Sequence, residues 1–391
     1  MISSTTLTLT DKNTHDAVAE RLATYLPLEA SGYECTTEMV LDVLIKAAAT
    51  QQTIECVCNE LDGMVSGETI RGYLNEQIKV DDLCDLEQRV NQALVAELPR
   101  RLWKTKLQVA IDLHDEPFYG HSAELLDFTC GGPAKKGTTR FFRLATAYVI
   151  FKDMRVTLVV LFVRPEDQLP DLVAALLRRL RILGLKIRRL YFDKGFCTTP
   201  VLRYVEKSGW SAILACPIRG KKGGTRGLCR GRASYHTQHT FKSQKYGNYT
   251  APITVVRTYT SRKRSKRGKR RATWLVFVTL KCTLTPKSVR KCYRRRFGIE
   301  TSYRCMRQVR AWTTSRNAAL RFLLMSLGFI LVNLWLEFRW YFCQVKQRRG
   351  PRKIDVKRFE LQRMLAFLNR VIETIYGAVS FIKADVTPLG V

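Results

Sequence analysis

Three acidic residues, Asp112, Asp193 and Glu300, have the type and setting of metal ligands. Asp112 ends an apolar run over residues 107–113, and Asp193 follows a second apolar run, so each lies where a predicted strand meets its loop. Glu300 is isolated, because residues 207–299 hold 25 lysines or arginines and no acid. Carboxylates that converge can hold two divalent cations for phosphoryl transfer, and Mg²⁺ or Mn²⁺ suits an all-oxygen site.

Glu300 also belongs to a regularly spaced group. Its members are Tyr293, Arg296, Glu300 and Arg307. On a single helix these intervals of three, four and seven residues form one stripe. A carboxylate flanked by cations and an aromatic hydroxyl is what a metal-dependent nuclease centre on DNA requires. Asp115 is a rival to Asp112, but only Asp112 lies within the apolar run.

The charge of the chain indicates a polyanionic partner. The formal net charge is +32 at pH 7, and residues 1–100 carry 17 acids against 7 bases, so residues 101–391 carry a net +42. A hydrophobic content of 46% indicates a folded chain rather than a disordered basic tail. We therefore expect a nucleic acid as the partner, and the motifs and resemblance given below imply double-stranded DNA.

Cysteine and histidine patterns give no sign of a disulfide or zinc framework. The 12 cysteines include no C-x-x-C pair, which favours reduced thiols in a cytoplasmic protein. The N-terminus lacks the charged and apolar regions of a signal peptide. The apolar run over residues 322–336 is shorter than the ~20 residues needed to cross a bilayer, so we expect a core helix and no membrane contact.

Periodicity predicts an α/β fold with an RNase H-like core. Apolar runs after residue 100 predict three strands, a helix, a strand, a helix and a strand. They cover residues 107–113, 141–151, 156–163, 169–185, 187–192, 200–208 and 212–216. In that fold the first and fourth strands are neighbours, so Asp112 and Asp193 would converge.

Five segments are expected along the chain. They are an N-terminal helical domain (1–100), the first part of the core (101–218), a basic β-rich insertion (219–285), the second part of the core with the Glu300 helix (286–345), and a basic linker with a C-terminal helix (346–391). The insertion contains a cationic turn that we expect to bind DNA phosphates. Its arginines are Arg262, Arg264, Arg267 and Arg270.

The N-terminal domain contains a candidate DNA reader. Two short helices across a glycine-containing turn, over residues 53–77, resemble a helix-turn-helix. Its second helix, residues 67–77, would present Arg71 and Asn75 to base edges. The alternative is an ordinary helical bundle that dimerises the protein.

These motifs resemble those of DDE transposases of bacterial or archaeal insertion sequences, in the IS-four superfamily and its ISH-three-type branch. Its signature, Y-x₂-R-x₃-E-x₆-K, is matched from Tyr293 to Arg307, with arginine replacing the final lysine. The sequence D-K-G-F from Asp193 is similar to its second-aspartate motif, commonly D-[RK]-G-[FY]. The resemblance covers roughly residues 38–340.

The resemblance implies an RNase H-like fold interrupted by a β-rich insertion, Mg²⁺ dependence, and cut-and-paste transposition. The implied partners are the terminal inverted repeats and target DNA, bound by a homodimer in the nucleoid of a prokaryotic cell. Tyr293, Arg296 and Arg307 would then contact phosphates at the transposon end, while Asp112, Asp193 and Glu300 hold the metal.

Two other functions remain open from the residues alone. A structure-selective RNase H-like nuclease would use the same three acids. A DNA-binding regulator derived from a transposase could be catalytically silent, although all three acids are intact. A tyrosine recombinase is disfavoured because it needs an H-x-x-R element, and none of the five histidines has an arginine three residues later.

Overall fold

The computed structural model describes residues 8–26, 28–30, 32–151, 154–259, 272–345, 347, 349 and 353–381. The chain divides into two compact units. Glu97–Tyr303 form one, here called the sheet unit, and Met1–Ala96 with Arg304–Val391 form the other, here called the helical unit. The four arginines of the predicted cationic turn lie outside the described residues.

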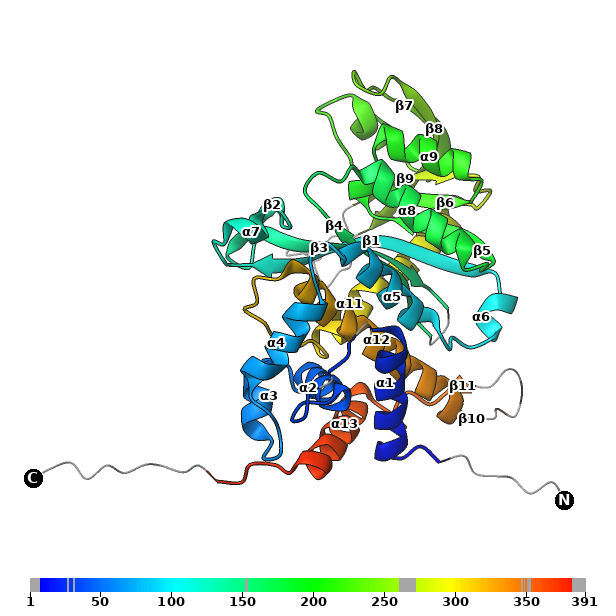
Figure 1. Ribbon diagram of the computed structural model, residues 1–391. Helices are drawn as coiled ribbons and strands as arrows, with labels where there is room; N and C mark the ends of the chain where they lie inside the picture. The colour runs from blue at the N-terminus through cyan, green and yellow to red at the C-terminus, as the bar shows by residue number, and fades with distance from the viewer. Residues whose placement is uncertain are drawn as a thin grey trace, which may run out of the picture. The chain divides into compact units, whose positions relative to one another are not determined.

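The sheet unit is built on a nine-stranded mixed sheet (Figure 1). The strand order is β2-β3-β1-β5-β6-β9-β8-β7, and β4 pairs with β3. The strands are β1 (Leu107–Phe118), β2 (Cys130–Lys135), β3 (Thr138–Val149), β4 (Thr157–Val163), β5 (Ile187–Phe192), β6 (Ala212–Cys216), β7 (Tyr235–Phe241), β8 (Tyr249–Tyr259) and β9 (Ala272–Leu280).

Five of these strands form the predicted RNase H-like core. β4, β3 and β1 are antiparallel, whereas β1, β5 and β6 are parallel. Parallel neighbours need crossover connections, and α8 (Leu169–Ile182) and α9 (Thr199–Ser208) supply them. Each helix has a proline in its first turn, where the missing N–H costs nothing. Gly209 ends α9 in the left-handed region, with φ of 87°, before β6 begins.

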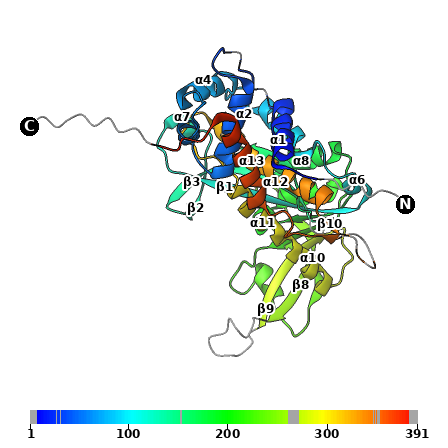
Figure 2. The ribbon, with the colours of Figure 1, turned by 90° about the horizontal axis from the view of Figure 1, so that it is seen from below.

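The predicted β-rich insertion extends the core sheet. β9 pairs antiparallel with β6, so β7, β8 and β9 continue the same sheet rather than forming one of their own. Figure 2 shows β8 and β9 side by side. The chain then continues through α10 (Pro286–Arg294), which packs against β8. Two short helices, α6 (Arg101–Lys104) and α7 (Ala123–Leu126), also belong to this unit.

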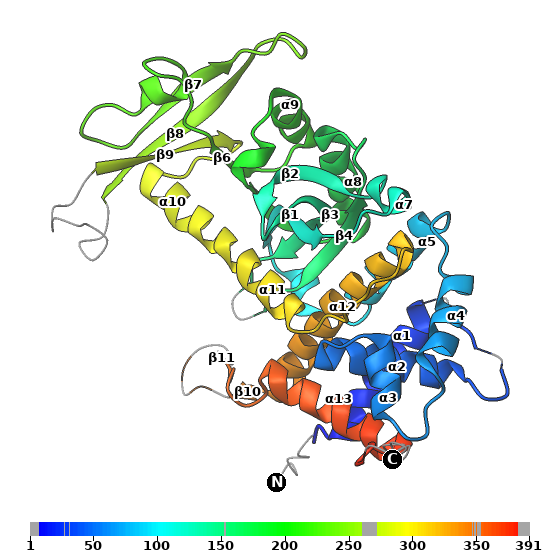
Figure 3. The same cartoon turned by 90° about the vertical axis from the view of Figure 1, so that its left-hand side faces the viewer.

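The helical unit joins the two ends of the chain (Figure 3). Its helices are α1 (Asp11–Tyr25), α2 (Thr37–Thr50), α3 (Ile54–Glu60), α4 (Gly67–Gln77), α5 (Leu83–Val95), α12 (Ala318–Phe342) and α13 (Leu361–Tyr376). A short hairpin of β10 (Gln344–Val345) and β11 (Lys353–Ile354) lies between the last two. α13 packs against α1 and α2, and α12 packs against α5.

This division differs from the expected segments at α12, which was placed with the second part of the core. α12 is long and apolar enough to cross a membrane, but 89% of its most apolar window is buried inside the protein. A helix that is apolar on all sides must be covered on all sides. Arg21 of α1 reaches it through a buried ion pair with Glu337, at 3.1 Å between Nη2 and Oε2.

A buried polar network links three helices of this unit. The Nε2 atom of His15 lies 2.7 Å from Oδ1 of Asp42, and the hydroxyl of Tyr376 donates to Oδ2 of Asp42 at 2.9 Å. The hydrogen bond to Asp42 raises the pKa of His15 against the opposing effect of burial. Because the charged imidazole is favoured in the folded state, its stabilisation is complete below the unfolded pKa and is lost as pH rises through the folded pKa.

We predict that His15→Gln lowers the Tm more at about pH 5.5 than at about pH 8.5, since only protonated His15 forms a full ion pair with Asp42. Thermal unfolding at both pH values measures this. His121→Gln, at an exposed histidine, is the control and should change little at either pH. An equal loss for His15→Gln at the two pH values would contradict the ion pair.

Candidate active site

The two predicted aspartates lie side by side where β1 and β5 stop pairing. Asp193 follows the end of β5 as predicted, but Asp112 lies within β1, which continues to Phe118, and not at a strand end. β1 and β5 are parallel, and their register pairs Ile111 with Phe192. Asp112 is the next residue of β1, and Asp193 is the first residue after β5 and leads directly into the 3-10 turn η1 (Lys194–Phe196). The predicted convergence is therefore a direct consequence of strand order and register.

A single buried arginine bridges both carboxylates. Nη1 of Arg296 lies 2.9 Å from Oδ2 of Asp112, and Nη2 lies 3.3 Å from Oδ1 of Asp193. The Arg296 side chain is 6% exposed, compared with 18% for Asp112 and 37% for Asp193. Among the described residues the Arg296 Nε has no hydrogen-bond partner, so the guanidinium is held by its two outer nitrogens.

The burial of this group changes the acidity of Asp112. Burial raises the pKa of Asp112 to about 6, Arg296 opposes the rise, and the charge of Asp193 adds to it. Two carboxylates this close cannot both ionise at low cost without a cation between them. Arg296 supplies that cation in this structure.

Three contacts fix the helical segment that carries Arg296 against the sheet. Tyr293 at the end of α10 donates its hydroxyl hydrogen to the Phe192 carbonyl at 3.1 Å. Further along, the Tyr148 hydroxyl donates to the Gly298 carbonyl at 3.3 Å. The third contact joins the hydroxyls of Thr146 and Tyr303, at 2.6 Å. The β3 residues Thr146 and Tyr148 were not among the predicted site residues, although polar side chains within an apolar strand are a signal for such contacts.

The predicted single stripe from residue 293 to residue 307 needs correction. The 3-10 turn η4 (Arg295–Phe297) separates α10 from α11 (Gly298–Arg307), and a 3-10 turn has a shorter period than an α-helix. Tyr293 and Arg296 are buried, whereas Glu300 and Arg307 are exposed. The four residues thus do not share one environment.

Glu300 is not gathered with the two aspartates into a three-residue cluster. Within the described part of the chain, no three His, Cys, Asp or Glu side chains are grouped closely enough to hold a metal ion. Its role as the third ligand stays a prediction. Phosphate contact by Tyr293 and Arg296 also stays a prediction, and it would require both side chains to exchange their present partners.

The rival carboxylate, Asp115, has a different environment. Its carboxylate pairs with Nε of Arg143 at 2.6 Å and with Nζ of Lys135 at 3.1 Å. Burial raises the pKa of Asp115, but the hydrogen bonds and charges of these two cations together outweigh burial and lower it. Of the two candidates, Asp112 is the one beside Asp193.

The residues present fit a divalent cation. Asp112 and Asp193 offer hard oxygen donors, and both are already directed at one shared positive group. The Arg296 guanidinium marks where positive charge is stabilised between them. Asp112, Asp193 and, on α11, Glu300 are the side chains that would hold the ions.

The proposed base-reading residues lie in the helical unit. α3 and α4 form across the expected turn, but Nη1 of Arg71 pairs with Oε2 of Glu55 on α3 at 2.5 Å. The Asn75 Oδ1 accepts from Nδ2 of Asn317 at 3.4 Å. Base reading by Arg71 and Asn75 stays a prediction, and Arg71 would have to leave Glu55 to perform it.

We predict that Asp112→Asn becomes less destabilising, or more stabilising, as pH rises from about 5 to about 7.5 in EDTA. The folded pKa of Asp112, near 6, lies above the unfolded value, so ionisation of Asp112 destabilises the fold. Over this pH interval the wild-type protein therefore loses about 1–2 kcal/mol of its free energy of unfolding. The asparagine variant lacks this titration, so its Tm relative to wild type should increase with pH. Asp115→Asn, whose carboxyl is ionised throughout, should show a constant difference. A constant difference for both variants would refute the raised pKa.

Comparison with known proteins gives a family match and structural matches. Residues 163–334, which include Asp193 and Glu300, match the family model of the transposase DDE domain. The structure is similar to a piggyBac transposase solved in a synaptic complex with hairpin DNA, with a TM-score of 0.53 and 11% identity over 94% of this chain and 76% of that chain. No curated protein matches the sequence. The structural match supports the RNase H-like fold, and residues 163–334 are similar to the transposase DDE domain.

Proposed function

We propose that this protein is a metal-dependent DNA transposase that excises and integrates an insertion sequence by cut and paste. The observation that carries the proposal is the pairing of Asp112 and Asp193 on neighbouring parallel strands of an RNase H-like sheet. The match of residues 163–334 to the transposase DDE domain supports it. The IS-four superfamily, with its ISH-three-type branch, and the cytoplasm of a prokaryotic cell are part of the proposal.

In this proposal Asp112, Asp193 and Glu300 hold two Mg²⁺ or Mn²⁺ ions. Such ions, when bound, supply Lewis-acid activation of the attacking and leaving oxygens of a phosphodiester. Before they bind, Arg296 neutralises the two aspartates and orients their carboxylates. The position of α11, anchored through Gly298 and Tyr303, then determines where Glu300 meets the substrate.

DNA binding in this proposal comes from the strong positive charge of residues 101–391. The exposed Arg307 on α11 and the arginines between β8 and β9 would neutralise backbone phosphates. The similar solved transposase was captured with hairpin DNA in a synaptic complex, and this likeness favours DNA as the substrate. A homodimer as the active assembly is part of the proposal.

We predict that Asp193→Asn and Glu300→Gln each reduce strand cleavage by more than about 100-fold, because each removes a metal ligand. The assay uses Mg²⁺ and duplexes bearing the terminal repeats of the element, with end binding measured in parallel. End binding should remain within a few-fold of wild type.

Asp115→Asn is the matched control, since it removes a nearby aspartate that already pairs with two cations. Wild-type cleavage by Asp193→Asn would end the assignment. Cleavage without joining of the cut ends to target DNA would identify a structure-selective nuclease instead.

A second prediction concerns the arginines between β8 and β9. Replacing Arg262, Arg264, Arg267 and Arg270 together by glutamine should weaken binding to all duplexes alike. For every phosphate that is no longer neutralised, the slope of log K against log salt should become shallower by about 0.9. Binding isotherms over a salt series measure both effects. A loss confined to one sequence would instead show that these side chains read bases.

A further inference from the structure

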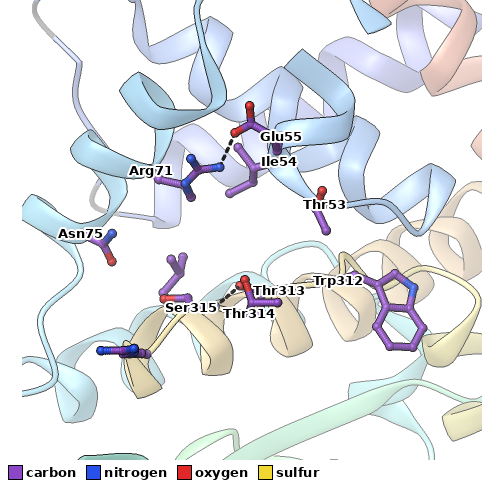
Figure 4. Close-up of a pocket in the computed structure, with 11 residues that line it drawn as sticks. Thr53, Ile54, Glu55, Arg71, Asn75, Trp312, Thr313, Thr314 and Ser315 are labelled. Carbon is purple, nitrogen blue, oxygen red and sulfur yellow. Dashed lines mark hydrogen bonds and ion pairs between the residues drawn. The ribbon is translucent and has the colours of Figure 1, made fainter. Parts of the chain in front are cut away.

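A pocket in the helical unit has no role in the chemistry described above. Its volume is about 330 Å³, which is in the range of small-ligand sites. Figure 4 shows side chains from α3 and α4 on one side and the segment from Trp312 to Ser315 on the other. This segment leads into α12 and is called here the pocket loop, residues 312–316.

The pocket loop is held in place by three hydrogen bonds to backbone carbonyls. The Trp312 N–H donates to the Gln52 carbonyl at 2.9 Å, just before α3. At its other end, Asn317 donates through Nδ2 to the Ile78 carbonyl at 2.5 Å. Nε of Arg321 also donates to the Ser315 carbonyl at 2.6 Å. The wall is therefore formed before any ligand arrives, which lowers the entropy cost of binding.

The loop offers donors suited to an anion. The Thr313 hydroxyl accepts from the Ser315 N–H at 3.0 Å, and the Ser315 hydroxyl accepts from the Asn317 N–H at 3.1 Å. Each hydroxyl hydrogen is thus left to donate elsewhere. Arg316 is exposed, and within the described part of the chain its side chain has no ion-pair or hydrogen-bond partner. Glu55, the one acid in the lining, is neutralised by Arg71.

An aromatic ring completes the pocket. The Trp312 side chain lies at one end of it (Figure 4), and the residue is 54% exposed. The guanidinium carbon of Arg310 lies 4.8 Å from the ring centroid, so the indole already carries a cation on its face. An exposed indole lines the same pocket as an uncompensated arginine and two hydroxyl donors, and this set matches the two parts of a nucleotide, its base and its phosphate.

We propose that this pocket binds one unpaired nucleotide of a DNA strand. The base stacks on Trp312, and the phosphate accepts hydrogen bonds from Arg316 and from the Thr313 and Ser315 hydroxyls. A paired base inside a duplex is stacked on both faces and cannot offer one to the indole, so the nucleotide must be unpaired. This inference rests on the proposed function in DNA processing and adds a strand-binding site in the helical unit.

The test compares a blunt duplex with the same duplex carrying a single-stranded tail of about ten nucleotides. Fluorescence anisotropy with the full chain should show tighter binding of the tailed duplex. Trp312→Ala should weaken binding of the tailed duplex about tenfold, because it removes a base–aromatic stack, and should leave the blunt duplex unchanged. Trp312→Phe should retain most of the preference.

Two exposed residues of the helical unit outside the pocket serve as controls. Tyr33→Ala removes a fully exposed aromatic ring and should leave the preference for the tail intact. Arg316→Gln should make the slope of log K against log salt for the tailed duplex shallower by about 0.7, the value for one single-strand phosphate. Arg358→Gln removes the same charge elsewhere and should not reduce that slope.

Photo-crosslinking locates the nucleotide directly. A tail with 5-iodouracil in place of thymine should crosslink to a peptide that contains Trp312. An unchanged tail preference in Trp312→Ala, or a crosslink outside the pocket loop, would overturn the proposal. If the wild-type protein cleaves terminal duplexes but shows no preference for the tail, only the pocket inference fails. If it binds no DNA at all, the proposed function fails as well.

Discussion

The structure of the candidate active site depends on Arg296, which forms ion pairs with both Asp112 and Asp193. Strand register brings two carboxylates to one edge of the sheet, where burial and mutual repulsion both oppose their ionisation. One guanidinium, donating through separate nitrogens, offsets part of both costs, since the pKa of Asp112 is still raised to about 6. Removing it would leave two part-buried aspartates without their shared counter-charge, and the cost of about 3–5 kcal/mol for breaking a fully buried pair is an upper bound here.

The same interaction joins the chemistry to the fold. Arg296 lies in the 3-10 turn between α10 and α11, so the ion pairs fix the helical segment on the sheet and with it the position of Glu300. The bond from Tyr293 to the β5 carbonyl strengthens this attachment. A divalent cation between the aspartates would compete with Arg296 for the same oxygens. Binding of metal and rearrangement of this arginine are therefore linked.

The sequence predicted the parts of the site that depend on local pattern. Apolar runs define β1 and β5, and the order of strands in an RNase H-like sheet makes them neighbours, so the approach of Asp112 to Asp193 could be predicted. The burial of Arg296 could not, because it depends on a 3-10 turn that changes the helical phase and on carboxylates more than 100 residues away. The sequence predicted one helix with Arg296 and Glu300 on the same face. In the structure Arg296 is buried and Glu300 is exposed.

In the helical unit too, the sequence predicts the local elements but not the contacts between distant segments. The bounds of α4, Gly67–Gln77, follow from its capping serine and its apolar spacing. The partner of Asn75 does not, because Asn317 approaches α4 from the other end of the sequence. α12 belongs to the same compact unit as the N-terminal helices and not to the sheet unit. Residues 1–100 therefore do not form a compact unit by themselves.

Anomalous diffraction from Mn²⁺ in crystals of the protein with terminal-repeat DNA tests the central claim most directly. The account predicts a manganese peak in coordinating contact with the carboxylate oxygens of both Asp112 and Asp193, with Arg296 displaced from at least one of them. A manganese peak at other carboxylates, with Arg296 still bridging the two aspartates, would contradict it.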